Sequence, residues 1–479
     1  MGYIKTAKFL KSDEDMPREV AQFMFKKVEI WIVYLTALLG LLFAIFFGIL
    51  VRQELVSGTK FGVVSEAALF LAEMPATIKA IIQKDEDLKA DKKKRFTDTD
   101  KSGFVGTPNL EPSYLLLSRY DGDKNEGIVE LVDLKNFDVL HTWNPKIDEM
   151  NELVDHNNPH FINLSRDVPE TRYILRHPIL FADGSLLFNH IGPLRKIDYC
   201  GELIWQNQEK GFHHSNEVDH EGNIWVPSRI YPYAVDEKYV GKTRGRFSDD
   251  GIAKLSPEGE ILFEKSVSQI LIENDMKYLL FGTGNAEFTR DPIHLNDIQP
   301  VFTDGPHWKT GDVFLSLRHQ SMALLYRPST DELLWVGTGH MYYQHDINIL
   351  NDHQISIFNN NVMNVASGTT VIGNNEVLIY DFNTDTYKSY LKNSMLEHDV
   401  RTTTAGRSEI LPNGDLIVEE TNFSRTLYFN SDGSLRWEHI NRARDGDVYR
   451  IKWSRLLHTA SDIDLVHNFL NTKQDCLNG

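Results

Sequence analysis

The longest uninterrupted run of apolar positions lies near the start of the chain. Residues 30–51, IWIVYLTALLGLLFAIFFGILV, contain no charged side chain. A helix that rises about 1.5 Å per residue over such a run crosses the roughly 30 Å hydrocarbon core of a bilayer. Arg52, Gln53 and Glu54 follow directly, where a cleaved signal peptide would have small residues. The pattern therefore predicts an uncleaved transmembrane helix rather than a signal peptide or a buried core helix.

The segments that flank this run predict its orientation. Four basic residues lie within 11–27, whereas only Arg52 and Lys60 follow the run closely. Loops on the cytoplasmic side of a membrane carry the excess of Lys and Arg. We therefore expect residues 1–29 in the cytoplasm and everything after residue 52 outside it, which is the periplasm in a bacterium.

Residues 52–105 contain a short apolar helical pattern and then a dense mixture of charges. The helical pattern covers 61–83 and is interrupted at Pro75. Residues 84–103 carry both charge signs and almost no large apolar groups, which is typical of a linker. We expect a juxtamembrane helix and a charged linker.

From about residue 106 the pattern changes to short β-rich runs that alternate with Gly, Asp and Asn. One motif is a turn followed within a few residues by a large aromatic; it occurs at 136–143, 199–205, 256–263, 329–335, 383–390 and 431–437. A second is an apolar strand introduced by a turn; it occurs at 181–188, 219–226, 309–317, 351–358 and 411–418. Each motif marks a β-hairpin. We expect the aromatic side chains of the first motif to be structurally equivalent, namely Trp205, Phe263, Trp335 and Trp437.

Six similar units of four strands over 106–457 are typical of a six-bladed β-propeller. A Greek-key sandwich is the competing all-β architecture, but it does not explain six similar units. The segment 448–455, VYRIKWSR, is predicted to close the ring against the first blade. Residues 458–479 remain as a C-terminal tail. The predicted fold is all-β, a six-bladed β-propeller behind an N-terminal transmembrane helix.

Charge and cysteine content narrow the function. The 479 residues include 50 Lys and Arg and 68 Asp and Glu, a formal net charge of −18. This balance argues against a nucleic-acid partner, which requires an excess of basic side chains. The 2 cysteines, Cys200 and Cys476, exclude a disulfide-dense scaffold and any CxxC site. The sequence leaves open whether they pair.

Histidines recur at similar places in successive blades. In a propeller the innermost strands line the channel, so residues at one offset in different blades meet near the axis. His214 and His345 each lie eight positions before a turn residue, and His294 precedes a longer turn. Asn216 and Asn296 share the next inward-facing position. We predict that these side chains converge.

Arginines recur as well. Arg229 and Arg318 each lie seven residues after a turn glycine, and Arg119 ends a similar strand in the first blade. Clustered cations without matching acids are costly unless an anion binds between them. We therefore predict a site for an anion, with His213, the neighbour of His214, as a further binding residue.

A metal site is the competing interpretation of the histidines. Three imidazoles can hold zinc with an open fourth position. Nearby arginines would repel a cation, and asparagine is a poor zinc ligand, so we expect no metal. Gly-rich phosphate loops, a GxSxG motif and a HExxH motif are absent from the sequence. We expect no cofactor.

At three stretches the sequence resembles the arylsulfate sulfotransferase family, the bacterial six-bladed propellers that move a sulfuryl group between phenols. The stretches are FHHSNEVDHEGNIW (212–225), DPIHLNDIQPV with GDVFLSLRHQSMALLYRPSTDELLWVGTG (291–339), and YQHDINILNDHQISIFNNN (343–361). They contain, in order, His-x-Asn, a strand ending in Ser-x-Arg, a hairpin ending in Trp and Gly, and Gln-His-Asp. The resemblance covers most of 106–457.

The resemblance implies a role for each matched residue. The family's nucleophilic histidine, which becomes transiently sulfated, falls on His345. The supporting histidines fall on His214 and His294, the supporting asparagine on Asn296, and the sulfate-holding arginine on Arg318. The implied substrates are an aryl sulfate donor and a phenolic or other hydroxyl acceptor.

Two points remain open in this resemblance. The family's last contact, a hydroxyl from the final blade, falls either within Thr402 to Thr404 or on Thr421. The family's secreted members carry a cleaved signal, whereas 30–51 predicts an anchor in the membrane.

The main alternative is a propeller on the outer side of the membrane that binds an anion, a glycan or a protein without catalysis. The combination of His345 and Arg318 favours the enzyme, because a binding module needs the arginine but not the nucleophile. The sequence leaves a homo-oligomer open.

Overall fold

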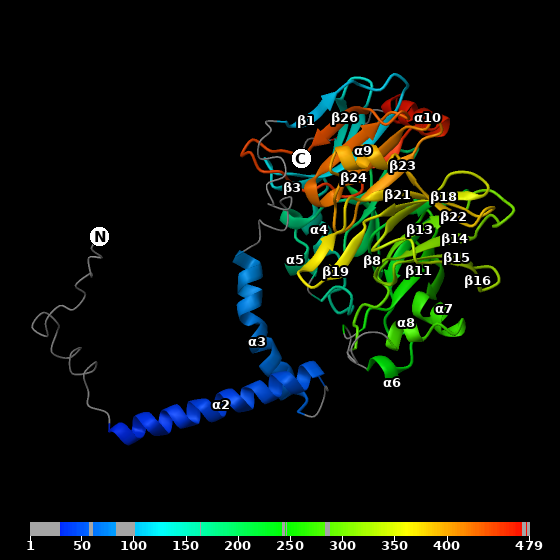
Figure 1. Ribbon diagram of the computed structural model, residues 1–479. Helices are drawn as coiled ribbons and strands as arrows, with labels where there is room; N and C mark the ends of the chain where they lie inside the picture. Colours follow the sequence, from blue (N-terminus) through cyan, green and yellow to red (C-terminus); the bar gives the residue numbers. More distant parts are fainter. Residues whose placement is uncertain are drawn as a thin grey trace, which may run out of the picture. The chain divides into compact units, whose positions relative to one another are not determined.

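The computed structural model describes residues 29–56, 61–82 and 101–476, apart from 163, 242–244, 246, 283–287 and 472–475. The chain divides into two compact units, Met1–Asp85 and Glu86–Gly479 (Figure 1). The predicted cytoplasmic segment, except for its last residue, and most of the charged linker lie outside the described residues.

The first unit contains helices α2 (Ile30–Val56) and α3 (Val63–Ile82). Apolar side chains of α2, such as Trp31 and Phe43, are exposed. Its segment Ile30–Gln53 is long and apolar enough to cross a membrane, a test that a signal sequence also passes. Helix α3 continues through Pro75, where the sequence predicts an interruption. The fixed φ of proline is compatible with a helix, although a helix-interior proline costs a hydrogen bond.

The second unit is an all-β propeller whose blades are antiparallel four-stranded meanders. The first three blades, each from its first strand outward, are β27 (Arg455–Leu457), β2 (Tyr114–Asp121), β3 (Glu126–Asp133) and β4 (Asp138–Trp143); β5 (Arg176–Leu180), β6 (Leu186–Asn189), β7 (Gly192–Ile197) and β8 (Leu203–Phe212); and β9 (Glu217–Val218), β10 (Ile224–Arg229), β11 (Asp250–Leu255) and β12 (Ile261–Ser266). The second and third blades form one continuous sheet, because the end of β8 pairs with β10.

The other three blades follow in the same order. They are β13 (Leu295–Pro300), β14 (Val313–Leu317), β15 (Met322–Arg327) and β16 (Glu332–Gly337); β17 (His345–Ile349), β18 (Gln354–Asn359), β21 (Glu376–Asp381) and β22 (Thr386–Tyr390); and β23 (Arg407–Ile410), β24 (Leu416–Glu420), β25 (Arg425–Phe429) and β26 (Leu435–Ile440). A separate hairpin, β19 (Val362–Val365) and β20 (Gly368–Val371), is inserted in the fifth blade. Counting in this way gives the six units that the sequence predicts.

Short helices occupy the connections between the strands. They are α4 (Ile147–Glu152), α5 (Leu164–Asp167), η2 (Glu170–Arg172), α6 (Glu237–Val240), α7 (Val267–Glu273), α8 (Tyr278–Phe281), η3 (Arg318–Gln320), α9 (Lys392–Glu397) and η4 (Thr421–Phe423). Helix α10 (Ala460–Asn471) follows the last strand.

The ring closes twice. At the C-terminal end β27 pairs with β2, and at the N-terminal end β1 (Gly103–Gly106) pairs with β26 (Figure 1). The closing strand begins at Arg455, the last residue of the predicted segment 448–455. The rest of that segment contributes isolated bridges from Ile451 to Arg119 and from Val448 to Arg442. The N-terminal strand β1 therefore lies in the sheet of the last blade, and the C-terminal strand β27 lies in the sheet of the first blade.

The four aromatic residues predicted to be equivalent do share one position. Each lies in the fourth strand of its blade, directly after the extra residue of a β-bulge in that same strand. In the first blade that position holds His141 rather than Trp143. A bulge bends and twists its strand, so its repetition gives the blades a common shape.

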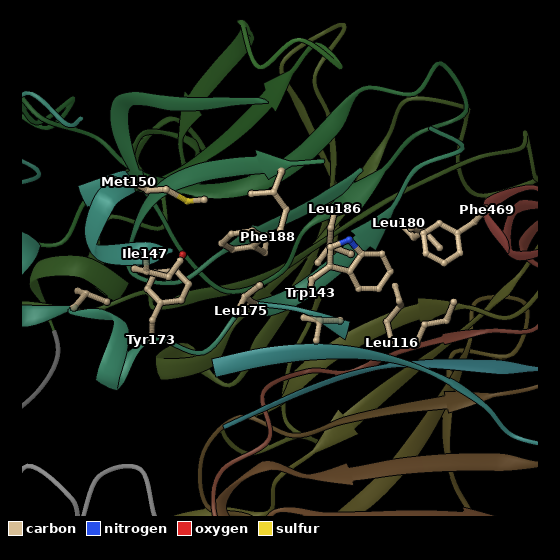
Figure 2. Packing of buried hydrophobic residues seen from close by; sticks show 14 of the residues in the cluster. Leu116, Trp143, Ile147, Met150, Tyr173, Leu175, Leu180, Leu186, Phe188 and Phe469 are labelled. Carbon is tan, nitrogen blue, oxygen red and sulfur yellow. The ribbon is translucent and has the colours of Figure 1, made fainter. Parts of the chain in front are cut away.

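The segment after the propeller packs on the first two blades. Helix α10 inserts Phe469 against Trp143, with ring centroids 5.4 Å apart, in a buried cluster that includes Phe188 (Figure 2). A disulfide joins Cys476 to Cys200 in the turn between β7 and β8, with a Cα–Cα distance of 5.5 Å. The segment 458–479, predicted as a tail, therefore contains a helix and a covalent link.

Candidate functional site

The candidate residues lie where the first strands of the blades begin. His345 is the first residue of β17, and His294 directly precedes β13. The other ends of the first strands line a cavity of about 840 Å³, whose lining includes Gln299, Asn348 and Glu409. None of the candidate histidines lines that cavity. The histidines therefore gather at one end of the channel, away from the larger opening.

His345 does not share the offset of the other two histidines. His214 and His294 have left-handed backbone just before the first strands of their blades, with φ of 63° and 54°, and the residue with this conformation just before β17 is Tyr343, with φ of 56°. By this alignment His345 occupies the position of Asn216 and Asn296, two residues later. The three rings converge from two offsets, not one as the spacing predicts.

A fixed tautomer is the main feature of His345, which is buried. Its Nδ1–H donates to Asn360 Oδ1 at 2.6 Å and lies 3.1 Å from the carbonyl oxygen of Tyr343. The Asn360 amide is oriented by donating through Nδ2 to the carbonyls of Thr402 and Ala405. Because both partners of Nδ1 are acceptors, the lone pair is on Nε2, which accepts from the Ala405 N–H at 3.1 Å.

The protonation state of this ring suits a nucleophile. Burial lowers the pKa of His345 well below its usual value, and the charge of Arg318 lowers it further. Burial also lowers the pKa of His214 well below its usual value, with Arg176 contributing. Both imidazoles are therefore neutral near pH 7.

Two buried carboxylates hold β17 between its neighbours. Asp297 in β13 accepts from the Ile347 N–H at 2.7 Å, and Asp346 accepts from the Ser408 N–H at 2.7 Å. Burial and the charge of Asp346 raise the pKa of Asp297 to about 8. Burial raises the pKa of Asp346 to about 6, against the lowering effect of Arg407. These contacts fix the register of the strand that begins with His345.

His294 has an acidic partner that the sequence analysis does not identify. Its Nδ1–H donates to Asp291 Oδ2 at 2.7 Å. Burial raises the pKa of Asp291, but the contacts with His294 and with Arg229 lower it below its usual value, so it is ionised. Asp291 therefore leaves Nε2 of His294 as the nitrogen available to a substrate.

His214 stands in a chain of side chains that also contains His213. The rings of His214 and His294 lie 5.0 Å apart between centroids, and Nδ1 of His214 is 2.7 Å from Nδ1 of His213. Asp250 faces the other nitrogen of His213 at 3.3 Å. One of the two Nδ1 atoms therefore donates to the other, whereas the His213 nitrogen that faces Asp250 forms no hydrogen bond.

The predicted arginines have different surroundings. Arg318 lies with its guanidinium 4.8 Å from the Tyr343 ring centroid and donates through Nη1 to His319 Nε2 at 3.0 Å. Its buried Nε has no hydrogen-bond partner. Arg229 instead forms an ion pair with Asp250, and it lies 4.0 Å from Asp291. Arg318 thus has an N–H that is free to donate to a substrate. Arg229 instead contacts Asp250 and Asp291, the acidic neighbours of His213 and His294.

Arg119 does not join the histidines. It binds Glu130 at 2.7 Å and Asp121 at 3.3 Å and lines a separate cavity of about 280 Å³ with His439. Its strand, β2, is the second of its blade, as are β10 and β14, so Arg119 differs from Arg229 and Arg318 in its partners and not in its strand position. The resemblance of its strand to those of Arg229 and Arg318 therefore does not place Arg119 at the site.

The side chains of the candidate asparagine and threonine residues mostly form hydrogen bonds within the protein. Asn296 donates to the Gln344 carbonyl at 2.8 Å, and its buried Oδ1 has no partner. The loop that contains Thr402 to Thr404 reaches the site through Ala405, next to His345. Thr402 Oγ1 lies 2.6 Å from Asn422 Oδ1, and Thr421 donates to Glu419 at 2.8 Å.

One group of side chains has the composition of a metal site. Ligand atoms of Asp291, His294 and His319 lie within 4.8 Å of one another. However, Arg318 donates to His319 Nε2 at 3.0 Å, and Asp291 already accepts from His294. A cation there would compete with a guanidinium, so the donor set fits an anion better than a metal.

Sequence reasoning does not identify several residues that position the site. Asp291, Asp250, His319 and Asn360 contact the predicted histidines and Arg318 directly. A signal existed for three of them, because Asp291 and His319 lie within the stretch 291–339 that carries the resemblance and Asn360 lies near the end of the stretch 343–361. Their roles depend on contacts between blades, which no spacing along the chain indicates.

Comparisons with known proteins bear on the family. No curated protein matches the sequence. Similar solved structures include a protein of unknown function from Bacteroides caccae (11% identity, 71% of this chain and 98% of that chain, TM-score 0.44), a streptogramin B lyase (12%, 74% and 96%, 0.36) and the Dos1 propeller (9%, 69% and 71%, 0.35). These likenesses are too distant to inform the function.

The family match is more informative. The model of the arylsulfotransferase (ASST) family covers residues 177–442. This range runs from the second blade to the end of the sixth and includes every histidine described above at the site. Since it spans more than half of the sequence, the chain belongs to the arylsulfotransferase family and is a sulfotransferase-like protein.

Proposed function

We propose that the protein transfers a sulfuryl group from an aryl sulfate to a phenolic or other hydroxyl acceptor through a sulfohistidine on His345. The observation that carries this proposal is the fixed tautomer of His345. Two acceptors hold its Nδ1–H, so the lone pair lies on Nε2. A neutral imidazole held in this way is a competent nucleophile.

In the first half-reaction Nε2 of His345 gives up the hydrogen bond from the Ala405 N–H and attacks the sulfur of the donor. A bond forms between Nε2 and sulfur, and the bond between sulfur and the aryl oxygen breaks. The leaving aryl oxygen takes the proton from Nε2 of protonated His294, whose ring Asp291 orients. Arg318 donates from its free Nε to the sulfuryl oxygens.

In the second half-reaction the acceptor hydroxyl attacks the sulfur. Its proton passes to neutral His294, the new oxygen–sulfur bond forms, and the bond from sulfur to Nε2 breaks. His345 and His294 return to their starting states. The net reaction exchanges one sulfuryl group between two hydroxyl-bearing molecules and needs no cofactor.

The test uses the full chain in detergent with a chromogenic aryl sulfate. We expect release of the phenol at a rate that increases when a second phenol is added, because the acceptor removes the group from the enzyme. Intact-mass analysis after mixing with donor alone should show one added sulfuryl group, which disappears on addition of phenol. If wild-type protein cleaves no donor, the binding module without catalysis is the better interpretation.

We further propose that residues 30–51 anchor the chain and that the propeller lies outside the cytoplasm. Residues 1–29 would then be cytoplasmic, and 52–105 would link the anchor to the propeller at 106–457. The support is the apolar helix, the basic bias of the sequence before it and the pairing of Cys200 with Cys476, since disulfides persist in oxidising compartments.

A fusion and a thiol assay test this location together. A reporter that is active only in the cytoplasm, fused after Gly479 and expressed in a bacterium, should be silent. In the same cells, Cys200 and Cys476 should react with a maleimide only after reduction. An active reporter together with freely labelled thiols would reverse the orientation.

A further inference from the structure

A buried arginine near the histidines has unused donors. Arg176, the first residue of β5, is 7% exposed, and its Nε and Nη1 have no hydrogen-bond partner. None of the salt bridges among the described residues includes it. A buried guanidinium without a partner costs free energy, which a bound anion would recover.

A lysine from the closing segment lies beside it. The carbonyl of Lys452 accepts from the His177 N–H at 3.4 Å, which places Lys452 next to the start of β5. Burial lowers the pKa of Lys452 well below its usual value, and the charge of Arg176 lowers it further. Among the described residues, no acidic oxygen lies within 4.0 Å of its ammonium.

The pair adjoins the histidines of the site. Asn189, opposite Arg176 across the β5–β6 ladder, donates to the His214 carbonyl at 3.1 Å. Trp453, directly after Lys452, lies between two rings, with centroid distances of 6.2 Å to His345 and 5.4 Å to His177. Arg176 and Lys452 therefore belong to the same end of the channel as the nucleophile.

The acidic group that approaches this pair is already bound. Glu419 raises the pKa of Lys452, but its oxygens accept from the N–H groups of Trp453 and Ser454 at 2.6 and 2.7 Å and from Thr421. Glu419 thus holds the closing segment and forms no ion pair with Lys452. The Nε and Nη1 donors of Arg176 remain free, and an anion bound beside them would favour the ammonium form of Lys452.

We propose that Arg176 and Lys452 form a subsite for a second anionic group, a carboxylate or a sulfate, on the aryl substrates. This inference rests on the proposed function. Donor and acceptor occupy the same site in turn, so the subsite selects either of them. A guanidinium and an ammonium together suit a carboxylate or sulfate, which accepts several charge-assisted hydrogen bonds.

The test compares acceptors that differ only in this charge. With one aryl sulfate donor, 3- and 4-hydroxyphenylacetate are measured against their neutral amides. Wild-type protein should have a KM for at least one acid that is roughly tenfold below that of its amide, as one charge-assisted hydrogen bond allows. Lys452→Met should raise the KM for that acid by about the same factor and leave the amide unchanged.

A binding measurement separates the subsite from catalysis. The same acid should raise the midpoint of thermal unfolding of the full chain, and Lys452→Met should remove that shift. Lys135→Met, at an exposed turn, is the matched control and should behave as wild type. Lys452→Gln replaces the methionine variant if that protein does not fold.

The outcomes distinguish the two proposals. Absence of sulfuryl transfer with a lysine-dependent thermal shift would overturn the proposed function but keep the subsite. Transfer to acid and amide with equal KM, or equal losses for both in Lys452→Met, would overturn the subsite alone.

Discussion

The His345→Ala variant is expected to lose sulfuryl transfer almost completely. The nucleophile forms the only covalent bond between the protein and sulfur in the proposed reaction, and the residues around it only position or protonate. Removal of a nucleophile typically costs on the order of 10⁴–10⁶ in turnover. Release of phenol from the donor and transfer to the acceptor should both disappear, because both pass through the same intermediate.

Intact-mass analysis makes this expectation specific to the covalent step. After mixing with donor, wild-type protein should carry one sulfuryl group and the variant none. His220→Ala, on an exposed turn, is the matched control and should retain both activity and labelling. Donor cleavage at the full rate by His345→Ala would show that the covalent mechanism is wrong.

The Arg318→Ala variant is expected to show the second largest loss. Its buried Nε–H has no hydrogen-bond partner, so it can donate to the sulfuryl oxygens as negative charge develops on them. Loss of one such donor costs about 10²–10³ in turnover, which is about 2.7–4 kcal/mol. The effect should appear in kcat for good and poor leaving groups alike, because the arginine acts on the sulfuryl oxygens rather than on the aryl oxygen.

Two control variants accompany Arg318→Ala. One keeps a positive charge at position 318, and the other removes a positive charge elsewhere on the protein. Arg318→Lys should recover part of the activity, since an ammonium supplies charge without the planar donors. Arg166→Ala, on the exposed surface, should leave turnover unchanged. An Arg318→Ala enzyme with near wild-type kcat would exclude the guanidinium from transition-state stabilisation.

Much of the fold is predictable because each blade repeats the same local signals. The turns before Trp205, Phe263, Trp335 and Trp437 indicate the third and fourth strands of their blades, and the structure places these rings at one position. Two features are not predictable in this way. Strand β1 and helix α10 are stabilised by residues hundreds of positions away, and neither carries a repeat signal.

The candidate site is predictable only in part, for a related reason. The spacing identifies His214, His294 and His345 as side chains of the channel, but it assigns one offset where the structure has two. The orientation of His345 depends on Asn360, and that of His294 on Asp291. Arg119 repeats the strand pattern of Arg318, yet neighbouring acids hold it elsewhere.

The double closure of the ring has a consequence for biosynthesis. Synthesis proceeds from the N-terminus, and β1 belongs beside β26; the nearby pair Lys101 and Glu438 lies 337 positions apart in sequence. The first blade likewise lacks β27 until nearly the whole chain has been made. The emerging propeller therefore presents two unpaired strand edges for almost its entire translation, and unpaired edges of this kind favour aggregation until their partners are made.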